Sequence, residues 1–141
     1  RVTDDDIEAL GRDIIARQPF AADIGVELVA LSLGKSELRL GLEARHTQHL
    51  GMAHGGVVAT LADMALAFAG GPLMGEGSVT QEFKINYLRP GKGEALVARA
   101  EVVGSGRSQA VVRADVFAVS GGTEKLCATA QGTIMRAASR S

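Results

Sequence analysis

The sequence predicts an α+β fold in which one long antiparallel β-sheet wraps around a single buried α-helix. A segment from about residue 55 to residue 69 has helical character and carries no polar stripe, and a helix that is apolar on all sides is buried on all sides. The chain after residue 78 alternates long strand-like runs with short Gly-rich turns, which is typical of an antiparallel meander.

The composition indicates one globular domain over residues 1–141, with an N-terminal helix in residues 1–19 and a frayed tail at 137–141. Hydrophobic residues make up 46% of the chain, which is enough for a core, and the net charge of −1 argues against nucleic acid as a partner. No signal peptide or membrane span is recognisable. With Cys127 as the single cysteine, which we interpret as a small apolar filler, we expect a cytoplasmic protein.

The N-terminal part of the chain predicts one helix and a β-hairpin. Residues 3–17 place apolar side chains at helical spacing, Thr3 can cap the helix, and Pro19 ends it. Residues 26–33 and 35–42 then form two strands. A polar connection leads from this hairpin to the central helix.

The central helix is expected to stop at Gly70-Gly71-Pro72, because glycine and proline are typical of helix ends. Four strands follow, over residues 79–88, 94–103, 107–119 and 123–136. Strict alternation in the first of these places Thr80 on the face opposite Phe83. A sheet of this size has two edges, and pairing of one edge with a second copy of the chain would cover it.

The glycines that open the central helix are candidates for binding a developing oxyanion. The first turn of a helix has unpaired N–H groups at the positive end of its dipole, and Gly55 and Gly56 allow an atom to approach that backbone closely. A tightly packed junction between loop and helix explains the same spacing equally well.

Asp63 is the charged residue of the apolar central helix, and a buried carboxylate is costly unless it is paired. Ala59 and Ala67 leave space beside it, so it is a candidate nucleophile or general base; a carboxylate satisfied within the core is the alternative. Gly55 and Asp63 are eight residues apart, or roughly 12 Å along a helix. If both act on one carbonyl group, one of them must come from a second subunit.

Three further polar residues are candidates. His54 directly precedes the central helix and either contacts a substrate oxygen or caps the helix. Gln48 either presents its amide to a carbonyl or is a solvated loop residue. Thr80 either hydrogen-bonds water or Asp63 or is an ordinary strand residue. His46 and His49 do not combine with His54 in the spacing of a standard zinc site, so no metal is expected. The Gly-x-Ser-x-Gly nucleophile motif is absent as well.

The motif Gln48-x-x-Gly51-x-x-His54-Gly55-Gly56, with Asp63 nine residues after His54, resembles the hotdog-fold thioesterases. The resemblance is strongest to the phenylacetate-pathway (PaaI-type) and 4-hydroxybenzoyl-CoA thioesterase group. It extends over roughly residues 20–135 and includes a segment that ends in Leu-Arg-Pro at residues 88–90.

The resemblance implies hydrolysis of an acyl-CoA thioester. Asp63 would act as nucleophile or general base, and the N–H of Gly55 would polarise the thioester carbonyl. Thr80 would supply the strand hydroxyl, with Ser78 as the alternative. CoA is then part of the substrate, and no separate cofactor is expected. Substrate contacts are expected from Gly56, Met52, Arg89, Lys92 and Arg107. The resemblance further implies homodimers formed by sheet continuation, which pair into tetramers.

Two other classes share this fold. Hydratases and dehydratases use a different His and acid arrangement, and their motifs are absent from this sequence. The remaining alternative is a non-catalytic module that binds acyl-CoA or serves in assembly. A carboxylate within an otherwise apolar helix argues against a purely structural role.

Overall fold

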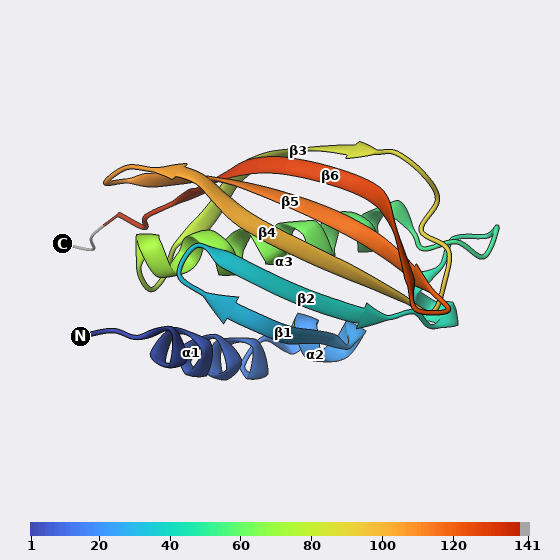
Figure 1. The fold of residues 1–141 in the computed structure, drawn as a ribbon, viewed down its shortest axis with the longest axis horizontal. Helices are drawn as coiled ribbons and strands as arrows, with labels where there is room; N and C mark the ends of the chain where they lie inside the picture. The colour runs from blue at the N-terminus through green and yellow to red at the C-terminus, as the bar shows by residue number, and fades with distance from the viewer. Residues whose placement is uncertain (139–141) are drawn as a thin grey trace.

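The computed structural model describes residues 1–138 and confirms the predicted architecture, with one antiparallel sheet curved around a long helix, α3 (Figure 1). Its six strands are arranged in the order β1-β2-β4-β5-β6-β3. The strands are β1 (Val26–Ser32), β2 (Lys35–Gly41), β3 (Val79–Tyr87), β4 (Ala95–Ser105), β5 (Gln109–Ser120) and β6 (Thr123–Met135). Of the predicted tail at 137–141, residues 139–141 lie outside the described residues.

The strand order differs from a simple meander at β3. The chain passes from β2 through α3 to the far side of the sheet, so β3 lies beside β6, and β1 lies at the opposite edge (Figure 1). Within residues 1–138, β3 pairs with β6 alone, and its other edge is open. An open edge of nine residues is a ready template for pairing with another strand.

The N-terminal helix begins as predicted. α1 (Asp4–Ala16) is capped by Thr3, whose hydroxyl accepts the N–H of Asp6 while the Asp6 carboxylate accepts the N–H of Thr3. These hydrogen bonds lower the pKa of Asp6. A second short helix, α2 (Pro19–Ile24), was not predicted: the proline that ends one helix also begins the next, because its fixed φ suits the first helical position.

The predicted end of the central helix is wrong, because α3 (Gly55–Met74) continues through Pro72. Gly71 has no Cβ to clash with the proline ring, so the position before Pro72 can stay helical. At Gly70 the helix approaches the sheet closely, since a Cβ there would lie 2.8 Å from Ile134 Cγ1. Gly70 therefore serves packing, and the helix ends at Met74 with Gly75 as its C-cap.

The prediction that the central helix is buried on all sides is also wrong within a single chain. One side of α3 is packed into the sheet, including Leu61, Ala62, Ala65, Leu66 and Ala69. α3 is long and apolar enough to cross a membrane, but the core helices of globular proteins are often equally long and apolar. Half of the apolar segment of α3 is buried within the protein. A stripe on the other side remains partly exposed; it comprises Gly56, Thr60, Asp63, Ala67 and Gly71.

Candidate active site

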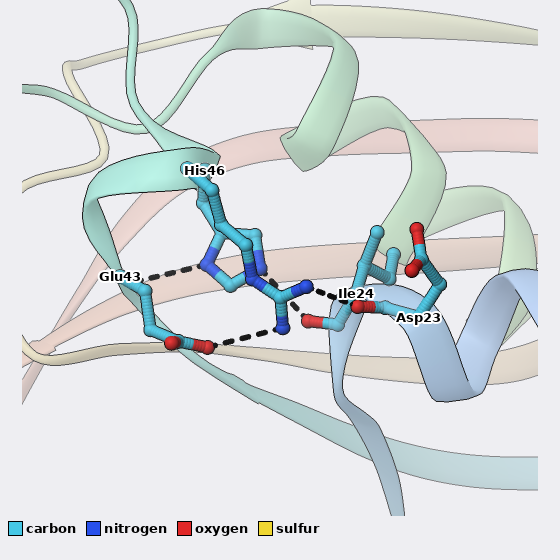
Figure 2. A network of polar contacts seen from close by, with 5 residues as sticks. Asp23, Ile24, Glu43 and His46 are labelled. Carbon is cyan, nitrogen blue, oxygen red and sulfur yellow. Dashed lines mark hydrogen bonds and ion pairs between the residues drawn. The ribbon is translucent and has the colours of Figure 1, made fainter.

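The loop before α3 is anchored by His46, at the end of the short 3-10 helix η1 (Ala44–His46). Its Nδ1 accepts the N–H of Glu43 at 2.9 Å, and its Nε2 donates to the carbonyl oxygen of Ile24 at 2.8 Å (Figure 2). Both ring nitrogens of this buried imidazole are thus used for structure. The carbonyl oxygen of His46 then accepts the N–H of His54 at 2.8 Å, which fixes the start of α3.

The first turn of α3 leaves one N–H group available. His54 caps the helix, which is one of the two roles predicted for it: its Nδ1 accepts the N–H of Gly56 at 2.8 Å. The N–H groups of Val57 and Val58 both donate to the His54 carbonyl. Among residues 1–138, no group accepts the N–H of Gly55. The position predicted to bind an oxyanion is therefore the one unpaired donor of this turn.

Tyr87, the last residue of β3, makes a second side-chain contact with the same turn. Its hydroxyl donates to the carbonyl oxygen of Gly55 at 2.8 Å. A Cβ on Gly55 would lie 3.5 to 3.7 Å from the Tyr87 ring and hydroxyl, so the ring packs directly on the glycine backbone. The end of β3 and the beginning of α3 are joined at this point.

A cavity of about 290 Å³ adjoins this turn. Four of the predicted site residues, Gln48, Met52, Gly55 and Arg89, line it together. The other lining residues are mostly apolar or small: Ala53, Val58, Tyr87, Leu88, Pro90, Gly91 and Cys127. A small apolar cavity with a few polar groups at a free backbone donor is typical of a substrate pocket.

Gln48 is held so that one end of its amide remains usable. Its Oε1 accepts the N–H of Leu50, and its backbone N–H donates to the Met52 carbonyl at 2.8 Å. Because the oxygen is engaged, the NH₂ end is the part that can donate to a carbonyl placed in the cavity.

Asp63 lies farther along α3 and is paired with Thr80 of β3, whose hydroxyl donates to Asp63 Oδ1 at 2.8 Å. The predicted strict alternation, which placed Thr80 opposite Phe83, is wrong. A β-bulge between Thr80 and Glu82 adds one residue to β3, and both Thr80 and Phe83 then point toward α3. Among residues 1–138, Asp63 Oδ2 accepts no hydrogen bond.

Several predicted site residues lie outside the cavity. Asp63 is roughly 12 Å from Gly55 along the helix, and it does not line this cavity. Lys92 is exposed in the loop between β3 and β4. Arg107 lies in the turn between β4 and β5, where its carbonyl oxygen accepts from Arg136, which also donates to Leu73 near the other end of α3. One chain thus contains two separated parts of the predicted site.

Cys127 belongs to the cavity wall and is buried, as expected for a small apolar filler. Burial raises the pKa of its thiol, an effect that the charge of Arg89 opposes, and a protonated thiol is a poor nucleophile. Its carbonyl oxygen accepts the N–H of Leu88 at 2.8 Å and that of Arg89 at 3.3 Å, which fixes the loop after β3.

Sequence reasoning did not predict the roles of two residues of this site. Tyr87 was a candidate to line a substrate pocket, and it does line the cavity, but nothing local in the sequence predicted its bond to Gly55. His46 was considered only as a metal ligand, whereas it anchors the loop. Among residues 1–138, no three His, Cys, Asp or Glu side chains gather in a way that could hold a metal ion.

A curved antiparallel sheet around one central helix defines the hotdog fold. Comparison with known proteins agrees with this assignment: a thioesterase family protein from Silicibacter pomeroyi is 40% identical and superposes with a TM-score of 0.85 over 88% of this chain and 93% of its own. A point mutant of the phenylacetic acid degradation protein PaaI from Thermus thermophilus is 34% identical, with a TM-score of 0.73, over 85% of this chain and 100% of its own.

The sequence comparisons agree with the structural ones. The model of the thioesterase superfamily matches residues 50–125. A protein of Saccharolobus solfataricus is 36% identical over 122 residues, which are 86% of this chain and 79% of that protein. Acyl-coenzyme A thioesterase 13 of Homo sapiens is 33% identical over 96 residues, 64% of this chain and 66% of its own length.

The chain therefore belongs to the thioesterase superfamily. This confirms the predicted family and fold, and it confirms that the protein is an enzyme of the thioester hydrolase class.

Proposed function

We propose that the protein hydrolyses acyl-CoA thioesters with an aryl or medium-chain acyl group, giving the free acid and CoA. The observation that carries the proposal is the unpaired N–H of Gly55, which adjoins a largely apolar cavity at the positive end of α3. A thioester carbonyl oxygen bound by this N–H gains negative charge as the carbonyl carbon is attacked. A preoriented backbone donor stabilises that charge.

The second part of the proposed chemistry belongs to Asp63. Thr80 donates to Oδ1 and fixes the carboxylate, while Oδ2 is left for the reaction. Oδ2 either attacks the carbonyl carbon, giving a mixed anhydride that water then hydrolyses, or removes a proton from the attacking water. In both routes the C–S bond breaks and the CoA thiolate leaves and takes up a proton.

We propose that the complete site forms between two subunits. The N–H of Gly55 and the carboxylate of Asp63 are roughly 12 Å apart along one helix, so they cannot act on one carbonyl group within a chain. The open edge of β3 and the partly exposed stripe of α3 that carries Asp63 lie side by side, and pairing of two β3 edges would cover both. Such a pair would bring Gly55 of one chain near the partner subunit's Asp63.

The acyl-CoA substrate class rests on the names of relatives, which include acyl-coenzyme A thioesterase 13 and PaaI. The cavity beside Gly55 would receive part of the substrate, with Gly56 and Met52 near it. Arg89 at the cavity, together with the exposed Lys92 and Arg107, would be available to the phosphates of CoA. We further propose a cytoplasmic tetramer formed by two dimers, without a separate cofactor.

The proposal is tested by measuring CoA release from aryl- and alkanoyl-CoA thioesters with wild type and Asp63→Asn. We expect the substitution to reduce kcat at least about 100-fold. Asp115→Asn is a matched control, because Asp115 accepts a hydroxyl bond from Thr129 at 2.7 Å in the same way, but on the outer face of the sheet.

Each outcome of this test is decisive. Loss of activity in Asp63→Asn, with Asp115→Asn unaffected, supports the proposed site, and the best substrate identifies the acyl group. A wild-type protein that binds CoA esters but hydrolyses none contradicts the proposal and favours the non-catalytic binding module. An active Asp63→Asn protein contradicts the role of this carboxylate.

A further inference from the structure

The Gly55-Gly56 turn is held by side chains on both sides, and one of these has no assigned role. The imidazole of His54 accepts the N–H of Gly56, and the hydroxyl of Tyr87 donates to the carbonyl oxygen of Gly55. Two consecutive glycines make the most flexible possible opening of a helix, because glycine restricts φ and ψ least. Both contacts are made to the peptide unit between Gly55 and Gly56, which directly follows the unit that carries the free Gly55 N–H.

Tyr87 is not a core residue in this structure. The residue is 54% exposed, whereas Ile85 and Phe83 on the same face of β3 pack against the hydrophobic core. Its specific contact in the described chain is the bond of its hydroxyl to Gly55, supported by packing of the ring on the glycine backbone. Core packing does not explain this tyrosine, because it is half exposed and its hydroxyl binds the first carbonyl of α3.

The hydroxyl of Tyr87 contacts the carbonyl oxygen of Gly55 and not its free N–H. The carbonyl that it binds belongs to the peptide unit between Gly55 and Gly56, while the free N–H belongs to the preceding unit. Rotation about the φ and ψ angles of Gly55 would move the two units relative to each other. A hydrogen bond to the carbonyl limits this rotation and does not contact the N–H itself.

We propose that Tyr87 is a positioning residue, whose hydroxyl holds the first turn of α3 so that the Gly55 N–H stays directed into the cavity. This inference rests on the proposed role of Gly55 in thioester hydrolysis. It extends that role to the end of β3 and links the two ends of the strand: Thr80 at its beginning fixes Asp63, and Tyr87 at its end fixes Gly55. One strand thus aligns both parts of the site.

The test compares Tyr87→Phe with Tyr87→Leu and wild type. Tyr87→Phe removes the hydroxyl and keeps the ring, and Tyr87→Leu removes both. Removal of an oxyanion donor costs about 100- to 1000-fold in kcat, so misdirection of a donor that remains is expected to cost less. We expect Tyr87→Phe to lower kcat about tenfold and to change KM less than about twofold, since substrate binding outside the carbonyl is retained.

A second measurement does not require turnover. In protein labelled with ¹⁵N-glycine, relaxation of the Gly55 and Gly56 amides reports the order of the turn. We expect Tyr87→Phe to lower the order of both amides while Gly132, a buried glycine of β6, stays unchanged.

The two measurements separate the possible failures. Lowered order together with a kcat effect supports the inference. Unchanged order and unchanged kcat in Tyr87→Phe overturn it, and so does an effect confined to Tyr87→Leu, since the ring alone would then matter. A wild-type protein without thioesterase activity contradicts the proposed function instead, while the relaxation data still decide whether the Tyr87 hydroxyl orders the turn.

Discussion

The hydroxyl of Thr80 reaches Oδ1 of Asp63, at 2.8 Å, because β3 bulges directly after Thr80. The bulge shifts the register between Thr80 and Glu82 and turns the threonine toward α3. Bulges are common beside active sites, where they redirect one side chain. In this protein the redirected side chain is the hydrogen-bond donor to the proposed catalytic carboxylate.

Thr80→Val is therefore expected to reduce kcat about tenfold, since the carboxylate loses the donor that orients it. The substitution keeps the shape and removes the hydroxyl. Thr80→Ser should recover most of the activity. Thr129→Val is the matched control, because Thr129 makes an equivalent 2.7 Å bond to Asp115 on the outer face. Steady-state kinetics of the four proteins decide the matter, and equal loss in Thr80→Val and Thr129→Val would contradict a specific role.

Mixing of two inactive variants tests the subunit arrangement. Gly55→Pro removes the N–H, and proline is tolerated at the first position of a helix. His54 has ψ 138°, which suits the residue before a proline. Asp63→Asn removes the carboxylate.

If the site is shared between subunits, co-refolding of the two variants in equal amounts restores about a quarter of wild-type activity, because half of the dimers then carry one intact site of two. CoA release is compared before and after co-refolding, with each variant refolded alone as a control. Absence of any recovery, with mixed dimers shown to be present, would mean that one chain supplies the whole site.

The limits of sequence-based prediction are visible in β3. The alternation of apolar and polar residues predicted this strand and its bounds to within one residue. It could do so because successive side chains of a strand point to opposite faces of the sheet. The bulge depends on a different strand: at Gly132 of β6 a Cβ would lie 2.4 Å from Glu82 O and 2.5 Å from Phe83 Cβ. A glycine fifty residues away allows this close approach, and the local sequence of β3 contains no sign of it.

The candidate site shows the same division. The candidate residues from Gln48 to Asp63 are close in sequence, so they could be recognised together. The separation of roughly 12 Å between Gly55 and Asp63 follows from the rise of an α-helix. The bond from Thr80 to Asp63 was one of the predicted roles of this threonine, and the structure confirms it. The bond from Tyr87 to Gly55 was not predicted, because it arises from the tertiary fold.

Gly70→Ala is expected to destabilise the fold by about 2 kcal/mol, because it forces extra volume into a closely packed contact. Its Cβ would lie 2.8 Å from Ile134 Cγ1 and 3.1 Å from Val112 Cγ2, and both side chains belong to the buried core. Urea unfolding measures the loss. Gly104→Ala is the control, since no atom lies within 4 Å of a Cβ at that position. If Gly70→Ala were as stable as wild type, the helix would not need glycine for its approach to the sheet.

The ion pairs on the outer face of the sheet give a prediction with a defined pH dependence. Arg99 binds Glu124 through two bonds, of 2.7 and 2.8 Å, and contacts Glu37 and the ring of Phe117. The hydrogen bonds to Arg99 lower the pKa of Glu124 from its ordinary 4.5. A carboxyl group whose pKa is lower in the folded state stabilises that state above its unfolded pKa, and this contribution is lost as the pH falls through the folded pKa.

Glu124→Gln should therefore lower the free energy of unfolding by about 0.2 to 1 kcal/mol at pH 7, the range for a largely exposed pair, and the loss should shrink in high salt. Below pH 4.5 the difference from wild type should decrease steadily. Urea unfolding at a series of pH values measures it. Glu101→Gln is the control, because Glu101 meets Lys35 at 4.0 Å with both side chains well exposed. A Glu124→Gln effect that is constant from pH 7 to acid conditions would show that the charge of this carboxylate does not contribute.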